Sequence, residues 1–205
     1  PTIWCPQTGN SCSIYCETDD ACTGLIIEGN QVENLSIFIM GNASNLYINK
    51  NYAAKFMDIR ITNQATFNNS IINGGTTSAQ DLTINCVQAQ SCSNLNINAE
   101  NMKGDMTFHC SAGITKCNDN EIICPHQQYT ETTQRCHYIC GDGNQCQNTI
   151  INARRGIDDI NWNCGFNSDL KVPNICTKSV LQCGLNYQYN RNWQFQGDAD
   201  IPWSL

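Results

Sequence analysis

Short stretches of alternating apolar and polar residues recur along the chain in two interleaved series. The first series begins with Asn or Asp and covers 34–37, 58–61, 81–84, 105–108 and 159–162. The second begins with Gly or Asn and covers 24–27, 45–48, 69–72, 94–97, 120–123 and 148–151. The first four members of the first series start 24, 23 and 24 residues apart. The chain therefore contains an internal repeat with two short strands in each period.

The spacing between strands predicts how they are arranged. Only 11 to 13 residues separate the start of most strands from the start of the next, which leaves no room for connecting helices. A doubly wound sheet is thereby excluded. We expect an all-β fold, a right-handed parallel β-helix of roughly eight coils of about 24 residues, with like residues stacked about 4.8 Å apart.

Alternation within each strand predicts which side chains face the core. In 81–86, Leu82, Ile84 and Cys86 point inward, and Thr83 and Asn85 point outward. The same rule gives a continuous apolar column in the first series: Leu35/Ile37, Ile59/Ile61, Leu82/Ile84, Met106/Phe108 and Ile160/Trp162.

Cysteines bracket the corners between strands of the two series. Three copies have five residues between the cysteines, one has six, and one has a longer insert. A disulfide at each corner, with two more assigned by proximity, gives Cys5–Cys12, Cys16–Cys22, Cys86–Cys92, Cys110–Cys117, Cys124–Cys136, Cys140–Cys146 and Cys164–Cys176. The rival arrangement joins adjacent coils, for instance Cys86 with Cys110. Cys183 is left over, either as a buried thiol or as a bond to another chain.

The composition indicates an exported protein. Fifteen cysteines in 205 residues, with no C-x2-C pair, indicate disulfides in an oxidising compartment rather than a zinc site. We therefore expect no metal and no cofactor. A net charge of -7 argues against a nucleic-acid partner, and there is no apolar run long enough to span a membrane. The absence of a leader pattern suggests the mature form of a secreted or cell-surface protein.

We expect one domain over residues 1–205. Residues 1–12 form a lead-in or cap, residues 13–185 form the coils, and residues 186–205 form an aromatic C-terminal cap or a docking tail. Two irregular inserts, 125–135 and 165–175, are expected to project as loops.

Asparagines mark two further features. Asn49, Asn73, Asn98 and Asn152 follow strands of the second series and predict a stacked ladder at a corner, where Asn tolerates a left-handed backbone. Asn34, Asn42 and Asn68 begin Asn-x-Ser sequons, and Asn42 is the preferred glycan acceptor because it lies between strands.

The repeated C-x5-C phrase followed by a short apolar strand resembles the cysteine-rich β-helix repeats of secreted and surface proteins of eukaryotic microbes. The resemblance covers most of residues 12–183, although residues 34–80 lack the cysteines and the loop residues differ from that family's preferred Gly and Ser. It implies the architecture, and no shared catalytic chemistry.

Enzymes with a pectin-lyase-like β-helix are the rival to this interpretation. Polygalacturonase-like chains carry several Asp residues with Gly-His-Gly and Arg-Ile-Lys motifs, whereas this chain offers only Asp158–Asp159, preceded by Arg154–Arg155. Another acidic pair, Asp19–Asp20, is expected to serve a turn. We therefore expect a non-enzymatic extracellular structural protein, the subunit of a filament, appendage or matrix that contacts other copies or related subunits. The alternative is a carbohydrate-binding or polysaccharide-degrading module.

Overall fold

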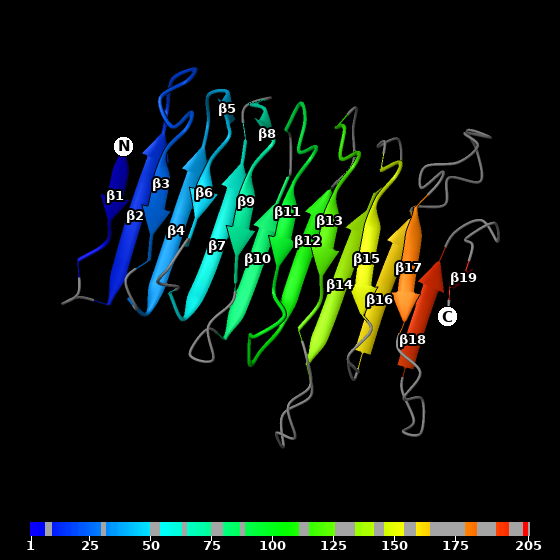
Figure 1. Cartoon of the computed structure of the whole chain (residues 1–205). Helices are drawn as coiled ribbons and strands as arrows, with labels where there is room; N and C mark the ends of the chain where they lie inside the picture. Colours follow the sequence, from blue (N-terminus) through cyan, green and yellow to red (C-terminus); the bar gives the residue numbers. More distant parts are fainter. Residues whose placement is uncertain are drawn as a thin grey trace.

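The computed structural model describes residues 1–6, 10–29, 32–49, 54–62, 65–74, 80–86, 89–110, 115–125, 134–141, 146–153, 159–164, 179–183, 192–196 and 203–204. Within these residues the chain is a parallel β-solenoid (Figure 1), which confirms the predicted fold class. The right-handed winding remains a prediction from the chirality of parallel connections.

Two large sheets face each other across the core, and a short third sheet lies at one corner. Sheet A contains β1 (Thr2–Trp4), β3 (Ile26–Glu28), β6 (Tyr47–Ile48), β9 (Ile71–Asn73), β11 (Asn96–Asn98), β13 (Glu121–Ile123), β15 (Ile150–Ala153), β17 (Val180–Cys183) and β19 (Trp203–Ser204). Sheet B contains β2 (Ser11–Cys16), β4 (Asn34–Ile39), β7 (Phe56–Ile61), β10 (Asp81–Asn85), β12 (Met106–Cys110), β14 (Arg135–Cys140), β16 (Asp159–Cys164) and β18 (Asn192–Gln196). Sheet C contains β5 (Ala43–Ser44) and β8 (Phe67–Asn68).

The chain alternates between sheets A and B, so neighbours within a sheet are one coil apart in the sequence. Figure 1 shows this as a steady advance of colour from blue at one end of the stack to red at the other. β18 and β19 lie in the segment expected as a C-terminal cap or tail, and they extend both large sheets.

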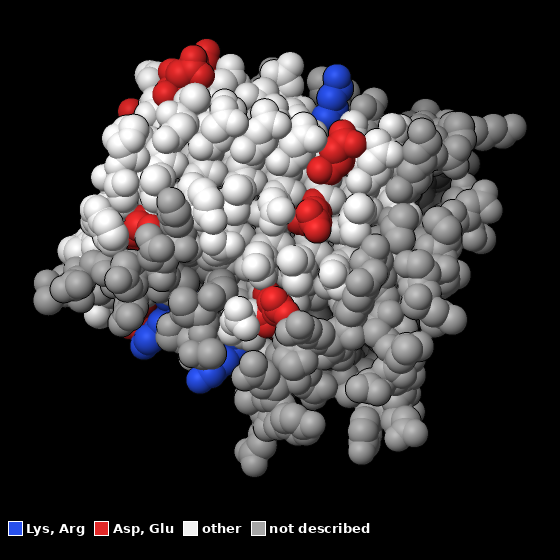
Figure 2. Space-filling view, viewed as in Figure 1, with Lys and Arg blue, Asp and Glu red and all other residues white. Residues whose placement is uncertain are grey.

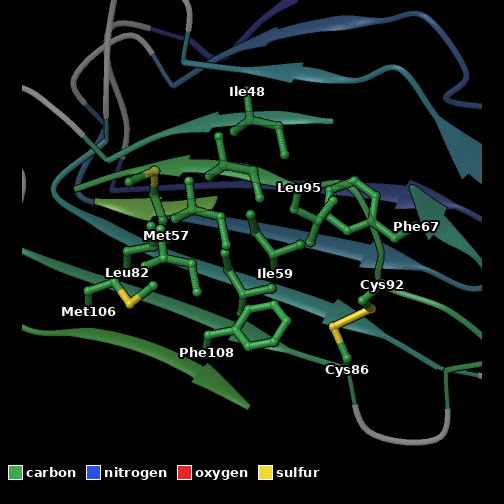
Figure 3. Packing of buried hydrophobic residues seen from close by; sticks show 14 of the residues in the cluster. Ile48, Met57, Ile59, Phe67, Leu82, Cys86, Cys92, Leu95, Met106 and Phe108 are labelled. Carbon is green, nitrogen blue, oxygen red and sulfur yellow. A yellow bond between two sulfur atoms is a disulfide. The ribbon is translucent and has the colours of Figure 1, made fainter. Parts of the chain in front are cut away.

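The core consists of the inward positions of both sheets. In β4 the burial alternates along the strand, with Leu35, Ile37 and Ile39 at 0–1% exposure, as the alternation predicts. Figure 3 shows buried side chains of successive coils lying against one another, including Leu82 against Met106. Phe108 also stacks on Tyr138 of the next coil, with ring centroids 5.4 Å apart. Each coil therefore buries its apolar side chains mainly against its two neighbours.

The register of β7 differs from the prediction. Leu35 and Leu82 both pair with Met57, whereas Ile59 pairs with Ile37 and Ile84. The expected row of Leu35, Ile59 and Leu82 was therefore wrong by two residues at β7. A shift of two keeps the same side chains inside, so the alternation could not detect it.

The start of β13 was wrong by one residue. The pattern aligned Asn120 with Asn94 and Asn148, but Asn94 corresponds in the structure to Asp119, because Ile97 pairs with Ile122. A shift of one exchanges the two faces of a strand, so Asn120 points inward and is buried.

The stacked column predicts a specific cost for shortening one side chain. Ile84→Ala should lower the free energy of unfolding by about 2–4 kcal/mol, because it leaves a cavity between Ile59 and Phe108. Thr83→Ala, one residue away on the outer face, should change it by less than about 0.5 kcal/mol. Urea unfolding of the two variants, with disulfides intact, checks this. Equal losses would contradict the assignment of the faces.

Candidate functional site

Six disulfides close corners of the coils. They are Cys5–Cys12, Cys16–Cys22, Cys86–Cys92, Cys110–Cys117, Cys124–Cys136 and Cys140–Cys146. These are six of the seven pairs expected from the sequence, and the rival bond between Cys86 and Cys110 does not form. Cys176 and the side chains of Cys164 and Cys183 lie outside the described part of the chain, so the expected Cys164–Cys176 bond stays a prediction. The number of disulfides indicates an oxidising environment.

One group of sulfur atoms has the proximity of a metal site. Sγ atoms of Cys110, Cys117 and Cys146 lie within 4.8 Å of one another and are buried. All three belong to disulfides, and zinc binds the thiolate form of cysteine. In this oxidised state the group is a contact between two stacked disulfides.

The left-handed corner lies at the start of the sheet A strands, not at their end. At this place φ is 52–59° in five coils, at Asn45, Asn69, Asn94, Asp119 and Asn148, and Gly24 occupies the same place with φ 70°. Five of these residues, from Gly24 to Asp119, donate their N–H to a carbonyl of the following coil. The second series contained this column except at Asp119, where it had Asn120, and the sequence pattern placed the corner conformation at other asparagines.

The predicted ladder of Asn49, Asn73, Asn98 and Asn152 is corrected in part, because the register stacks only the first three in one column. Only Asn49 has a positive φ, 55°, and Ile123 interrupts the column between Asn98 and Asn152. Asn49 is buried, accepts the Gly29 N–H at 2.9 Å, and donates to the Asn73 carbonyl and to the Met57 sulfur. Asn98 accepts the Glu100 N–H within its own turn at 3.0 Å. Asn49 thus links neighbouring coils, whereas Asn98 stabilises its own turn.

A different ladder links successive coils at the corner near sheet C. Side-chain oxygens of one coil accept backbone N–H groups of the next: Asp19 from Asn42, Asn42 from Thr66, Asn68 from Ser93, Ser93 from Asn118 and Asn118 from Gln147, at 2.8–3.1 Å. These bonds satisfy backbone donors where the strands of sheet C are too short to do so. The acidic pair expected at a turn agrees with this, since Asp19 joins the ladder and Asp20 accepts the Thr23 hydroxyl at 3.1 Å.

Buried polar side chains line the inner side of the same corner. Ser70, Asn120, Thr149 and Ser179 are all at most 1% exposed. Asn120 accepts the Leu95 N–H at 2.9 Å and donates to the carbonyls of Cys92 and Cys117 at 3.1 and 3.0 Å. Because these side chains satisfy backbone groups that bend away from the sheets, they serve the fold.

The outer face of sheet B carries a groove. It has a volume of about 340 Å³ and spans β4, β7 and β10. Its outward-facing lining residues are Asn34, Ser36, Phe56, Asp58, Arg60, Asp81, Thr83 and Asn85. Arg60 forms an ion pair with Asp58 at 2.6 Å. The buried Asn85 Oδ1 has no hydrogen-bond partner in the described part of the chain.

An aromatic stack borders this groove. Tyr15 and Phe38 have ring centroids 5.0 Å apart and nearly parallel planes, and the Arg60 guanidinium lies 6.0 Å from the Phe38 ring centre. Tyr15 is 57% exposed. Aromatic, amide and paired charged side chains together can recognise a polar ligand that also has apolar faces.

Two neighbouring aspartates continue this face towards β12. The Asp105 N–H donates to Asp81 Oδ1 at 2.8 Å, and the Arg135 N–H donates to Asp105 Oδ1 at 2.9 Å. Partial burial, with a smaller contribution from Asp81, raises the pKa of Asp105 above its ordinary 3.8, while the Arg135 N–H opposes the rise. Both carboxylates act as backbone acceptors between coils.

The acidic pair that could have been catalytic is described only in part. Asp158, Arg154 and Arg155 lie outside the described residues. Asp159 begins β16 and pairs with Arg135 in the register of sheet B, the column that also contains Asp81. Its position at the start of the strand agrees with the structural interpretation of the first series.

The three sequons differ in their surroundings. Asn34 is exposed at the start of β4, whereas Asn42 and Asn68 are partly buried and use their side-chain oxygens in the corner ladder. The structure therefore does not favour Asn42 over the others as the sequence did.

Charge is sparse on the surface. Figure 2 shows acidic side chains in small separate groups with uncharged surface between them. In the described residues, no helix has the length and hydropathy that a membrane span requires.

Removal of the buried Asn120 amide should be costly. Asn120→Ala leaves the Leu95 N–H and two carbonyls without this partner, so unfolding should become easier by about 3 kcal/mol. Glu121→Ala, at the exposed neighbouring position, should change the value by less than about 0.5 kcal/mol. Urea unfolding measures both. A loss at Asn120 as small as that at Glu121 would show that water replaces the amide.

The raised pKa of Asp105 predicts a pH-dependent effect of its replacement. Above that pKa the folded state holds a partly buried charge, and this penalty disappears as the pH falls and the carboxyl takes up a proton. Asp105→Asn should therefore stabilise the protein at about pH 7, by an amount that shrinks on acidification. Asp105→Ala should destabilise it, because Arg135 N–H loses its acceptor. Unfolding curves across the acidic range test both; a gain for Asp105→Asn that grows on acidification would contradict the assignment.

Comparison of the chain with protein-family models, with curated proteins and with solved structures gives no match.

Proposed function

We propose that this chain is an extracellular structural protein, a subunit of a surface filament, appendage or matrix. It joins other copies of itself, or related β-solenoid subunits, through the end of the stack formed by β2. The resemblance to secreted β-helix repeat proteins of eukaryotic microbes and the disulfide-closed corners support this setting.

The observation that carries the proposal is the outer edge of β2. β2 is the terminal strand of sheet B, and in the described residues no strand pairs with its outer side. The carbonyls of Asn10 and Cys16 accept N–H groups from the next coil at 2.9 Å. The backbone N–H and C=O groups of successive residues in a strand point to opposite sides. The odd-numbered residues between Asn10 and Cys16, including Ser13 and Tyr15, therefore direct their N–H and C=O groups away from β4. A six-residue unpaired edge is a template for another strand.

Exposed aromatic side chains occur at the same end. Tyr15 on β2 is 57% exposed and Trp4 on β1 is 55% exposed, the two highest values among the large apolar residues described. Phe38 covers one face of the Tyr15 ring. A partner chain that continued the sheet would bury further aromatic surface there, which gives association a hydrophobic contribution besides backbone hydrogen bonds.

The alternative is a carbohydrate-binding or polysaccharide-degrading module, and the groove on sheet B favours it. A monomer that is retained on a polysaccharide matrix, and is released when Arg60→Ala is introduced, would support this alternative. A chain that forms ordered polymers, independent of Arg60, supports the structural role.

Blocking one N–H on the edge of β2 tests the proposal. Ser13→Pro removes an outward N–H, and proline is tolerated on an edge strand in such a position, so the fold should persist. Polymers of the wild type, seen by electron microscopy and light scattering, should be lost, with at least about a tenfold fall in association affinity. Ser13→Ala is the matched control and should assemble normally. A wild type that stays monomeric at high concentration, or a Ser13→Pro variant that polymerises normally, would refute assembly through this edge.

A further inference from the structure

We infer that Asn34 carries an N-linked glycan and that the groove on sheet B holds its first sugar against Phe56. This modification site goes beyond the proposed structural role and does not depend on assembly.

The sequon at Asn34 lies in the surface strand β4, and its asparagine and its serine both face the groove. Asn34 and Ser36 alternate with Leu35, which is 1% exposed, so the two polar side chains lie on the outer face of β4. Both line the groove. Asn34 is exposed, and its side-chain Nδ2 donates one hydrogen bond to the Asn10 carbonyl at 3.2 Å. An amide has two hydrogens on this nitrogen, so a glycan can replace one while the other keeps the bond.

The other two sequons differ in ways that bear on this choice. The Asn42 oxygen accepts both the N–H and the hydroxyl of Thr66, at 3.0 Å each. The Asn68 oxygen is held by Ser91 and Ser93, and its sequon serine, Ser70, is 1% exposed. Neither asparagine lines the groove on sheet B. Of the three, Asn34 combines exposure with an adjacent hollow of about 340 Å³.

The side chains of the groove suit the binding of a neutral N-acetylated sugar. Phe56 is the in-register neighbour of Asn34 on the next coil, so the two side chains emerge about 4.8 Å apart. A sugar attached to Asn34 begins within reach of the half-buried Phe56 ring, whose apolar face suits the C–H face of a pyranose. Beyond the ring, the Asp58–Arg60 pair and the Asn85 amide offer donors and acceptors for hydroxyl and acetamido groups.

The covalent step is ordinary glycosyl transfer. The Asn34 amide nitrogen attacks C1 of a polyprenyl-pyrophosphate-linked oligosaccharide, and an N–C bond forms as the bond between C1 and the pyrophosphate oxygen breaks. The nitrogen loses one proton to a base of the transferase, and polyprenyl pyrophosphate leaves. The transfer involves no oxidation or reduction. In this step the chain supplies only the acceptor sequon. After the transfer, the groove of the folded chain binds the first sugar.

The test uses the full chain secreted from a eukaryotic cell line. Site mapping by mass spectrometry should find a glycan on Asn34 in the wild type and in Ser13→Ala, the control for an outward serine. It should find none on Asn34 in Ser36→Ala, which removes the sequon and keeps the asparagine. An unmodified Asn34 in the wild type overturns the inference, whatever the state of assembly.

The contact between the first sugar and Phe56 is tested by the rate at which an amidase releases the glycan from the native protein. Phe56→Ser should raise that rate at Asn34 by about threefold or more, because release scales with the fraction of time that the sugar spends off the ring. Tyr47→Ser, an outward aromatic on β6 of sheet A and away from the groove, should leave it unchanged. Equal release rates in the wild type and both variants would contradict the contact between the sugar and Phe56. If Phe56→Ser does not fold, NMR of the wild type is the test. Upfield shifts of protons of the first sugar, with contacts to the Phe56 ring, would support the contact. Their absence would contradict it.

Discussion

The structure depends on one constraint, that each coil must return to the same register above its neighbour. Parallel strands of sheet B pair in register from β2 to β18, so each inward position lies opposite the equivalent position one coil away. Burial and backbone hydrogen bonding are both satisfied only between coils, since a single coil has no core of its own. The length of the corner segments therefore matters as much as the strands. One extra residue in a corner would exchange the inward and outward faces of the next strand.

The corners meet this constraint with polar chemistry and disulfides. A residue with a left-handed backbone begins the path into sheet A in successive coils, and Asn or Asp takes that place where Gly does not, because its side chain tolerates this conformation. Beside it, oxygens of Asn, Ser and Asp accept the N–H groups of the next coil, and the buried Asn120 binds three backbone groups. The high Asn content of the chain thus has a specific use. It satisfies the backbone where strand pairing stops.

Much of the architecture could be predicted from the sequence, because period and alternation are direct consequences of stacked strands. Corner disulfides could also be predicted, since their cysteines are close in the sequence. Register could not. At β7, Met57 and Ile59 are equally good inner residues for the position beside Leu82, and at β13 both Asp119 and Asn120 are suitable for a left-handed corner. The groove depends on register: the predicted alignment puts Asp58 beside Asp81, whereas the structure puts Phe56 between Asn34 and Asp81. The candidate site was therefore missed although each of its residues was visible.

The division between inner and outer columns explains where this fold leaves room for function. Inward positions of sheet B are fixed by packing, and the corners are fixed by hydrogen bonds and disulfides. The outward column Ser13, Ser36, Asp58, Thr83, Thr107 consists of small polar residues outside the core, so packing does not fix their identity. Yet its neighbours in the same face are ordered by the register, so the exposed Asn34 is held about 4.8 Å from Phe56 on the next coil, and the Asp58–Arg60 ion pair follows Phe56 on the same strand. A scaffold of this kind positions surface chemistry at no cost to the core. Replacements at these outward positions of sheet B should therefore change the surface of the protein without changing how it folds.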